Sequence, residues 1–250
     1  MTLSLSDTST WLPLDGLAPG FDANKGPLCT DLDSLTFTFG PYTATFTGSD
    51  VSWNGATVPC ETFLVDDRLY YAQFLHDNKA VSLLLDVREG QTLVVTSRLG
   101  SGLPRVTQSF EPFPLDGAEG HGDMMAPSTA LIGRRAMWVY SGEHTYEHVY
   151  LSPHWYTWQC LAGPERGLAD TDENSVYRVR PGIYVFTWRE KVIPCGAFTI
   201  ADHRDTTNLR SHGALFGLGS AGETEHFTFG AYGRLLSLTA HPADVDPARG

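Results

Sequence analysis

The sequence has little positive charge: 17 Lys and Arg residues stand against 29 Asp and Glu residues, a formal net charge of −12. A protein that binds nucleic acid needs a basic face, and an anionic membrane surface attracts clusters of Lys and Arg. No stretch approaches the roughly 20 apolar residues that span a bilayer, and the first residues lack the basic start and apolar run of a secretion signal. We therefore expect a cytoplasmic protein that binds neither nucleic acid nor membrane.

Closely spaced cysteines are also missing. Cys29, Cys60, Cys160 and Cys195 are scattered and form no CxxC motif, so we expect reduced thiols that pack as small hydrophobic residues. The sequence contains no P-loop, no dinucleotide-binding glycine motif and no G-x-S-x-G motif. These absences argue against nucleotide chemistry and a serine hydrolase, and we expect no cofactor.

Helical periodicity is almost absent, whereas short β-rich runs recur roughly every 8–12 residues between Gly, Pro, Asn and Asp turns, as in β-sandwiches and β-barrels. The sequence therefore predicts an all-β protein of two antiparallel barrels, with one larger barrel as the alternative. The expected order is an N-terminal arm with at most one helical turn, a first barrel, a Pro- and Gly-rich linker, a second barrel and a tail, at residues 1–34, 35–112, 113–130, 131–240 and 241–250.

The two halves resemble each other. Leu69–His76 aligns with Ile183–Glu190, and each is followed by an apolar strand that ends at Asp, Val81–Asp86 and Ala197–Asp202. This pattern predicts a duplicated β-meander. The second copy carries far more Tyr, Trp and His residues than the first, so we expect the active site in the second barrel and a structural or lid role for the first.

The run from His144 to His148 reads H-x-x-E-H, which on a helix is a zinc-protease signature. Its neighbours are β-branched and aromatic, however, and these residues favour a strand, where residues four apart lie roughly 13 Å apart. We therefore assign no metal, although a site that adds a distant residue such as His212 or His226 stays open. The D-x-D pair, Asp170 and Asp172, is expected in a turn, where it would cap the loop.

Strand alternation sorts the candidate site, because residues i, i+2 and i+4 share a face. Glu190 would be a carboxylate among aromatic rings, a setting that raises a carboxyl pKa and suits general acid–base chemistry. Arg166 could hold a substrate carboxylate or phenolate by a bidentate contact. Each has a structural alternative: Glu190 as a solvated partner of Arg189 or Lys191, and Arg166 as a loop residue. The predicted catalytic residues are Glu190, His144, His148 and Tyr140, and the predicted substrate-binding residues are Trp138, Tyr146, Tyr150, Arg166, Tyr184 and Trp188.

Three motifs of the second half, Met137–His148, Gly167–Asp172 and Thr187–Lys191, resemble the C-terminal domain of the molybdenum cofactor biosynthesis protein F (MoaF) family. Residues 35–112 resemble the N-terminal domain of that family more weakly. The resemblance implies lipocalin-like (calycin) barrels, and the family's name implies a link to molybdopterin. We see no pterin or molybdate site in the sequence.

The second half also resembles, more distantly, the phenolic acid decarboxylases, small lipocalin-like barrels that need no cofactor. Trp138 and Tyr140 fall where that family has two tyrosines, Arg166 falls near its arginine, and Trp188-Arg189-Glu190 reproduces its Trp-x-Glu motif. The resemblance implies that the two tyrosines of that family hold the substrate carboxylate. One of them is missing here, which argues against simple decarboxylation of a hydroxycinnamate.

Two functions follow from these features. One is a cofactor-independent lyase or isomerase, decarboxylase- or cyclase-like, that acts on a small aromatic or conjugated substrate in the second barrel. The alternative is a non-catalytic lipocalin-like protein that binds a small molecule, linked to molybdenum cofactor metabolism. A monomer and a homodimer both fit the sequence, because the duplication could supply within one chain the pair of barrels that decarboxylases form as dimers.

Overall fold

The computed structural model describes residue 8, residues 10–118 and residues 122–249. The predicted arm, linker and tail also include residues 1–7, 9, 119–121 and 250, which lie outside this description. As predicted, the regular structure is almost entirely β-strand, and the described helices are α1 (Leu14–Leu17) and the 3-10 turn η1 (Pro247–Arg249). Neither helix is long and apolar enough to cross a membrane.

The first half is an eight-stranded antiparallel sheet in which each strand pairs with the next along the chain. Its strands are β1 (Thr36–Phe39), β2 (Tyr42–Thr47), β3 (Asp50–Trp53), β4 (Ala56–Asp66), β5 (Leu69–His76), β6 (Lys79–Asp86), β7 (Gln91–Leu99) and β8 (Val106–Pro114).

The second half repeats this meander and closes it, because β12 also pairs with β13. A short strand of the predicted linker, β9 (Ala126–Pro127), is added outside β13. The barrel strands are β10 (Arg134–Val139), β11 (Thr145–Tyr150), β12 (Trp155–Ala162), β13 (Ala169–Arg180), β14 (Ile183–Arg189), β15 (Cys195–Asp202), β16 (Leu209–Leu218) and β17 (Thr224–Leu238).

The duplication is confirmed strand by strand. The segments aligned in the sequence are β5 with β14 and β6 with β15, which are the fifth and sixth strands of the two eight-strand meanders, counted from β1 and from β10. The first copy differs from the expected closed barrel, because its described strands β1 and β8 do not pair with each other. Pro112 and Pro114 remove two amide donors from β8, as is typical of an edge strand. The two edges still meet, since the amide of Asp116 donates to the carbonyl of Thr38 across 2.9 Å.

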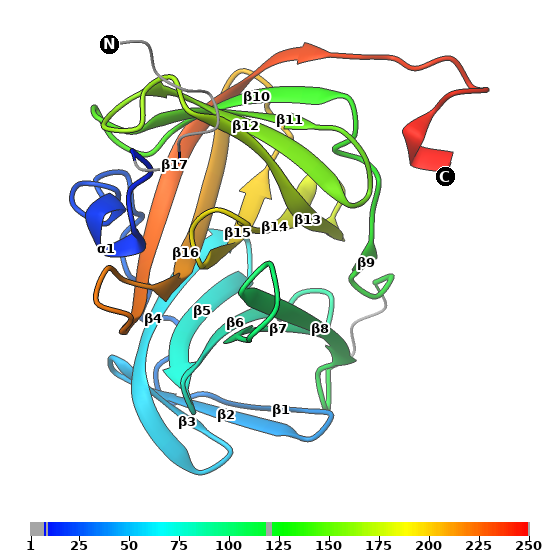
Figure 1. Ribbon diagram of the computed structural model, residues 1–250. Helices are drawn as coiled ribbons and strands as arrows, with labels where there is room; N and C mark the ends of the chain where they lie inside the picture. The colour runs from blue at the N-terminus through cyan, green and yellow to red at the C-terminus, as the bar shows by residue number, and fades with distance from the viewer. Residues whose placement is uncertain (1–7, 9, 119–121, 250) are drawn as a thin grey trace.

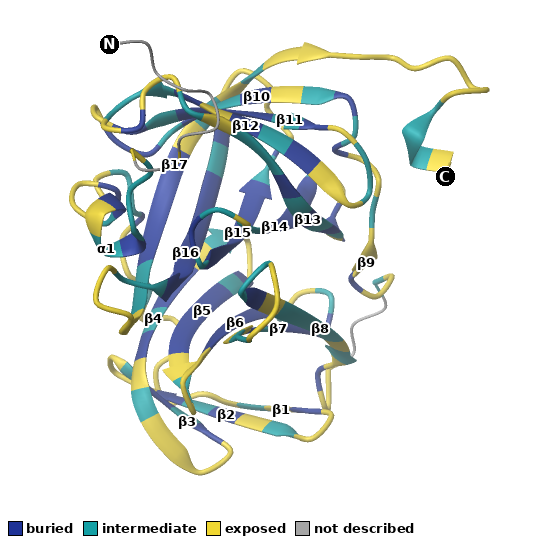
Figure 2. Cartoon of the chain, in the orientation of Figure 1, coloured by how far each residue is buried: buried dark blue, intermediate teal, exposed yellow. Residues whose placement is uncertain are grey.

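The two halves pack against each other through a shared core of apolar side chains. The outer face of β4–β7 lies on the outer face of β13–β15, with the rings of Tyr71 and Phe198 stacked at 5.0 Å. The strands at this junction are therefore buried on both faces, as the dark bands of Figure 2 show. Arg180 crosses the junction and donates to the carboxylates of Asp86 and Asp66.

One prediction for the second barrel is wrong. Asp170 and Asp172 lie inside β13, not in a turn. Pairing with β12, which sets Trp158 opposite Asp170 and Tyr156 opposite Asp172, overrides the low strand propensity of Asp.

Candidate functional site

The H-x-x-E-H segment forms strand β11, preceded by His144, as the β-branched and aromatic residues predict. The side chain of His148 is 4% exposed and faces the barrel interior, whereas Glu147 forms a bidentate ion pair with Arg135 of β10. The helical zinc site is therefore excluded by the backbone. Among the described residues, no three His, Cys, Asp or Glu side chains cluster as a metal site would require.

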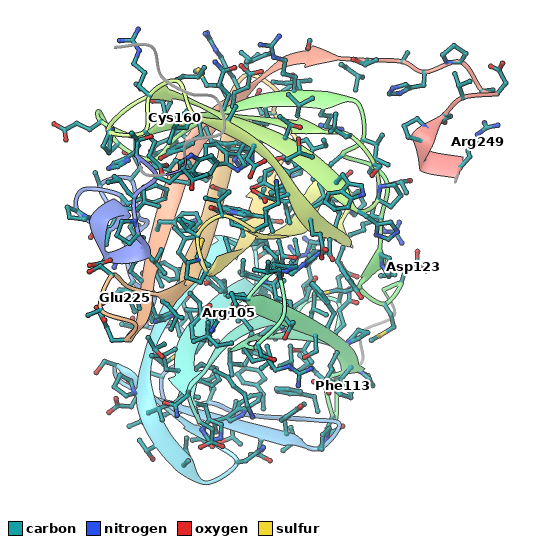
Figure 3. All side chains as sticks on the ribbon, viewed as in Figure 1. Arg105, Phe113, Asp123, Cys160, Glu225 and Arg249 are labelled. Atoms are coloured by element: carbon teal, nitrogen blue, oxygen red, sulfur yellow. The ribbon has the colours of Figure 1, made fainter. Side chains whose placement is uncertain are left out.

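A cavity of about 40 Å³ lies inside the second barrel. Side chains otherwise fill this interior, including Cys160 of β12, which Figure 3 labels. Aromatic rings and two carboxyl groups surround the cavity. Its lining consists of Leu17, Phe21, Tyr140, Tyr146, His148, Tyr156, Trp158, Glu165, Trp188, Glu190 and Leu215.

Glu190 follows the last residue of β14, and its carboxyl group lies against the ring of Trp188. The indole Nε1 donates to Oε1 of Glu190 across 3.1 Å. Burial raises the pKa of Glu190 to about 8, with further contributions from the negative charges of Asp172 and Glu165. A carboxyl group with this pKa changes its protonation state near neutral pH, which general acid–base catalysis requires.

The second carboxyl group of the cavity belongs to Glu165, whose neighbour in the sequence was the predicted site residue. Tyr146 donates its hydroxyl to Oε2 of Glu165 across 2.9 Å, and burial raises the pKa of this carboxyl group as well. Arg166 is exposed and does not line the cavity. Strand alternation does not extend through the turn at Gly163–Gly167, so it could not show which of the two residues points inward.

Asp172 is a third carboxyl group at the site, buried directly behind the cavity wall. It is 1% exposed and accepts a hydrogen bond from Nε1 of Trp158 across 2.9 Å. Burial raises its pKa. Once β13 is known to begin at Ala169, alternation with the inward-facing Asn174 and Val176 would have placed Asp172 on this face.

The two predicted catalytic histidines lie in different places. His148 lines the cavity, and burial lowers its pKa to about 3, so its imidazole is neutral at physiological pH. His144 lies outside the cavity, where its Nε2 is 3.2 Å from the carbonyl oxygen of Pro19. It therefore holds the N-terminal arm and does not face the barrel interior.

Three predicted substrate-binding residues form a separate cluster within the barrel. The rings of Trp138, Tyr150 and Tyr184 surround His203, with centroid distances of 5.7, 6.4 and 5.9 Å. All are buried, but none lines the cavity. The structure thus brings Tyr140, Tyr146, His148, Trp188 and Glu190 together around the cavity.

The N-terminal arm lines one side of the cavity, a role that the sequence did not reveal. Phe21 stacks on Tyr140 with centroids 4.5 Å apart, and Leu17 at the end of α1 lies beside it. Helix α1 packs against β16 (Figure 1). Farther along the same arm, Asn24 donates its Nδ2 to the carbonyl of Val139 across 2.9 Å. The arm has no periodic pattern, so only the folded structure shows which of its residues face the barrel.

A larger, open hollow of about 810 Å³ lies on the other side of the arm, between the two halves. Several of its polar groups are already paired: Lys25 with Glu61 at 3.1 Å, and His226 with Gln73 at 2.8 Å. The smaller cavity holds the carboxyl group of Glu190, whose pKa lies near neutral pH, and the ring of His148, whose Nδ1 has no hydrogen-bond partner among the described residues. We therefore take the smaller cavity as the candidate site.

Comparison with known proteins gives one consistent result. A model of the MoaF C-terminal domain matches residues 125–239, and a model of the MoaF N-terminal domain matches residues 9–101. The protein MoaF of Klebsiella aerogenes is 31% identical over 212 residues, which cover 76% of this chain and 79% of that protein. A crystal structure provisionally described as a beta-lactamase of Burkholderia vietnamiensis covers 42% of this chain and 95% of its own, at 15% identity and a TM-score of 0.34, too low to support an inference.

Proposed function

This chain belongs to the MoaF family, which is linked to molybdenum cofactor biosynthesis, and we propose that its second barrel performs acid–base chemistry on a small aromatic or conjugated molecule. The proposal rests on one observation: a carboxyl group with its pKa raised to about 8, that of Glu190, opens onto a cavity walled by aromatic rings. Such a group donates a proton and recovers it within one turnover, so the reaction needs no redox partner. This is lyase or isomerase chemistry without an organic cofactor.

The other cavity residues support this role. Glu165 and Tyr146, joined by a hydrogen bond of 2.9 Å, form a second proton-bearing pair on the same cavity. His148 is a poor proton carrier because its pKa is lowered to about 3 by burial and by the neighbouring His203. We therefore assign the second proton-handling role to the Tyr146–Glu165 pair, and to His148 the role of a neutral hydrogen-bonding group. Trp188 would orient the Glu190 carboxyl group.

A non-catalytic carrier is the second candidate, and the size of the cavity favours it. At about 40 Å³, with Leu17 and Phe21 of the arm on its lining, the cavity admits little without a rearrangement, and a pocket lined mostly by apolar and aromatic side chains suits retention of a ligand. Under this alternative, Glu190 would only hydrogen-bond the bound molecule.

Turnover assays with mass spectrometry separate the two functions. The purified protein is incubated with a library of small conjugated molecules in H2O and in D2O. A lyase product has lost mass, whereas an isomerase product has the mass of its substrate in H2O and gains deuterium in D2O. Glu190→Gln should lower turnover by about 10²–10⁴, the usual contribution of general acid–base catalysis, and Glu143→Gln, at an exposed loop residue, should not.

Retention of a library molecule without any chemical change would favour the carrier. Full activity in Glu190→Gln, with loss of activity in His148→Ala, would show that the carboxyl group is not the catalyst. Circular dichroism of each variant checks that the barrel is folded.

A further inference from the structure

The charge of the barrel cavity is one-sided. Of its eleven lining residues, Glu165 and Glu190 are acidic, and none is Lys or Arg. The Arg166 guanidinium, which the sequence places nearby, is exposed. The cavity therefore has no positive side chain that could pair with a negatively charged ligand.

The next shell around the cavity adds negative charge. Asp172 lies behind Trp158, and its negative charge helps to raise the pKa of Glu190. The cation closest to this group is Lys191, whose Nζ is 3.6 Å from Oδ1 of Asp172, but its side chain is 48% exposed and reaches Asp172 from the solvent side. A negative ligand would make it still harder to ionise these carboxyl groups, whereas a positive ligand would favour their ionised forms.

The rings around the cavity complement these carboxyl groups. Tyr140, Tyr146, Tyr156, Trp158 and Trp188 surround it, with Tyr146 and Trp158 at 6.0 Å and Tyr156 and Trp188 at 6.0 Å between centroids. The faces of such rings attract cations, and cages of this kind bind ammonium groups in other proteins.

An unsatisfied polar atom on the cavity wall also indicates a ligand. His148 is 4% exposed, and its Nδ1 has no hydrogen-bond partner among the described residues. A buried polar atom without a partner costs free energy comparable to that of a lost hydrogen bond. A bound molecule with a polar group would remove this cost.

We propose that the second barrel binds a small organic cation, a molecule whose positively charged nitrogen sits among the aromatic rings and faces Glu165 and Glu190. The proposal rests on the proposed function, because it names the class of molecule that the same cavity takes. It replaces the carboxylate or phenolate that Arg166 was expected to hold. Entry requires the cavity to widen, because at about 40 Å³ it is smaller than such a molecule, and Leu17 and Phe21 are the lining side chains that the N-terminal arm contributes.

Three probes of matched shape and different charge test the proposal: tetramethylammonium, tert-butanol and pivalate. Each is titrated at pH 7 into the wild-type protein and into Phe21→Ala, which enlarges the mouth of the cavity. NMR of the indole N–H groups of Trp158 and Trp188 reports binding at the site, since these groups bond to Asp172 and Glu190. Their signals are assigned with Trp158→Phe and Trp188→Phe.

We expect tetramethylammonium to bind about tenfold more tightly than tert-butanol, the scale of a desolvated cation–π contact, and pivalate to bind most weakly. Glu165→Gln should reduce the preference for the cation severalfold, while Glu143→Gln in the exposed loop leaves it unchanged. If Phe21→Ala does not fold, Leu17→Ala opens the same mouth.

The proposal is wrong if pivalate binds as tightly as tetramethylammonium, or if the preference is the same in wild-type, Glu165→Gln and Glu190→Gln proteins. It is also wrong if none of the probes shifts either indole signal in the opened variant. These results do not depend on turnover. If the wild-type protein prefers the cation and Glu190→Gln keeps full activity, the proposed chemistry is wrong and the cation site stands. If the protein shows no preference for the cation and Glu190→Gln loses activity, the cation site is wrong and the proposed chemistry stands.

Discussion

Trp188 donates its indole N–H to the carboxyl group of Glu190 across 3.1 Å, although Glu190 already lies beyond the end of β14. The backbone pairing continues one residue past the strand, because the amide of Glu190 donates to the carbonyl of Cys195 across 2.9 Å, and the ring of Trp188 holds the carboxyl group itself. The Trp-x-Glu spacing is effective because alternation places both side chains on the inner face of the barrel.

This hydrogen bond lowers the pKa of Glu190 against the effect of burial. We therefore expect Trp188→Phe, which removes the donor and keeps an aromatic ring, to raise the pKa of Glu190 further above 8. Titration of the Glu190 carboxyl carbon by NMR measures the shift. Trp155→Phe, at a residue that is 46% exposed, is the control, and an equal shift in both variants would contradict the assignment.

Glu190 should also make stability depend on pH. Its pKa is about 4.5 in an unfolded chain and about 8 in the fold, so between these values the folded state binds more protons than the unfolded state. The free energy of unfolding should therefore fall as pH rises from about 4.5 through 8.

Glu190→Gln cannot lose a proton, so its stability should not show this part of the fall. Each pKa unit is worth about 1.4 kcal/mol, and allowing for partial exposure of the residue, we expect wild type to lose on the order of 2 kcal/mol relative to the variant between pH 5 and pH 9. Urea titrations at several pH values measure the difference. Parallel curves for the two proteins would show that the Glu190 carboxyl group has an ordinary pKa.

Arg180 joins the two halves through buried charges. Its side chain is 3% exposed and donates to Asp86, which is fully buried, at 2.6 Å, and to Asp66 at 2.8 Å. Arg180→Ala leaves Asp86 buried without its partner and should cost about 3–5 kcal/mol of unfolding free energy, measured by urea titration.

Arg204 provides a matched control, because it contacts the same Asp66 but its side chain is 46% exposed. Arg204→Ala should cost less than about 1 kcal/mol. Similar losses in the two variants would mean that burial of the Arg180–Asp86 pair is not what makes it important.

Gly163 fixes the loop that carries Glu165. It has a φ of +122°, and a Cβ atom there would lie 2.1 Å from the carbonyl oxygen of Glu143. Gly163→Ala should displace the loop, destabilise the protein by more than about 1 kcal/mol, and weaken the hydrogen bond between Tyr146 and Glu165. The facing Gly142 has open space around it, so Gly142→Ala should change the melting temperature little in calorimetry. Equal losses would contradict this difference.

The sequence predicted the parts of the protein that follow a strict period. The fifth and sixth strands of each eight-strand meander were aligned correctly, and alternation correctly grouped Tyr146 with His148 and Trp188 with Glu190. These inferences succeed because a strand allows only two directions for a side chain.

The predictions failed where the period is interrupted or the partner is distant. Alternation does not extend through the turn at Gly163–Gly167, so the sequence indicated Arg166 where the structure places Glu165 on the cavity. Phe21 comes from an arm without periodicity. The partners of Arg180 are 94 and 114 residues away in the chain, and no local pattern specifies a contact of that range. Long-range packing therefore determined the residues that sequence reasoning missed.

β14 is buried on both faces, and each face packs in a different core. Even-numbered residues such as Phe186 and Trp188 lie within the barrel, whereas the odd-numbered Ile183 and Val185 lie in the core shared with the first half. Selection for a new ligand can act on the even positions while the odd positions keep the two halves joined. The specificity of the barrel can therefore evolve, or be engineered, without loss of the architecture that supports it.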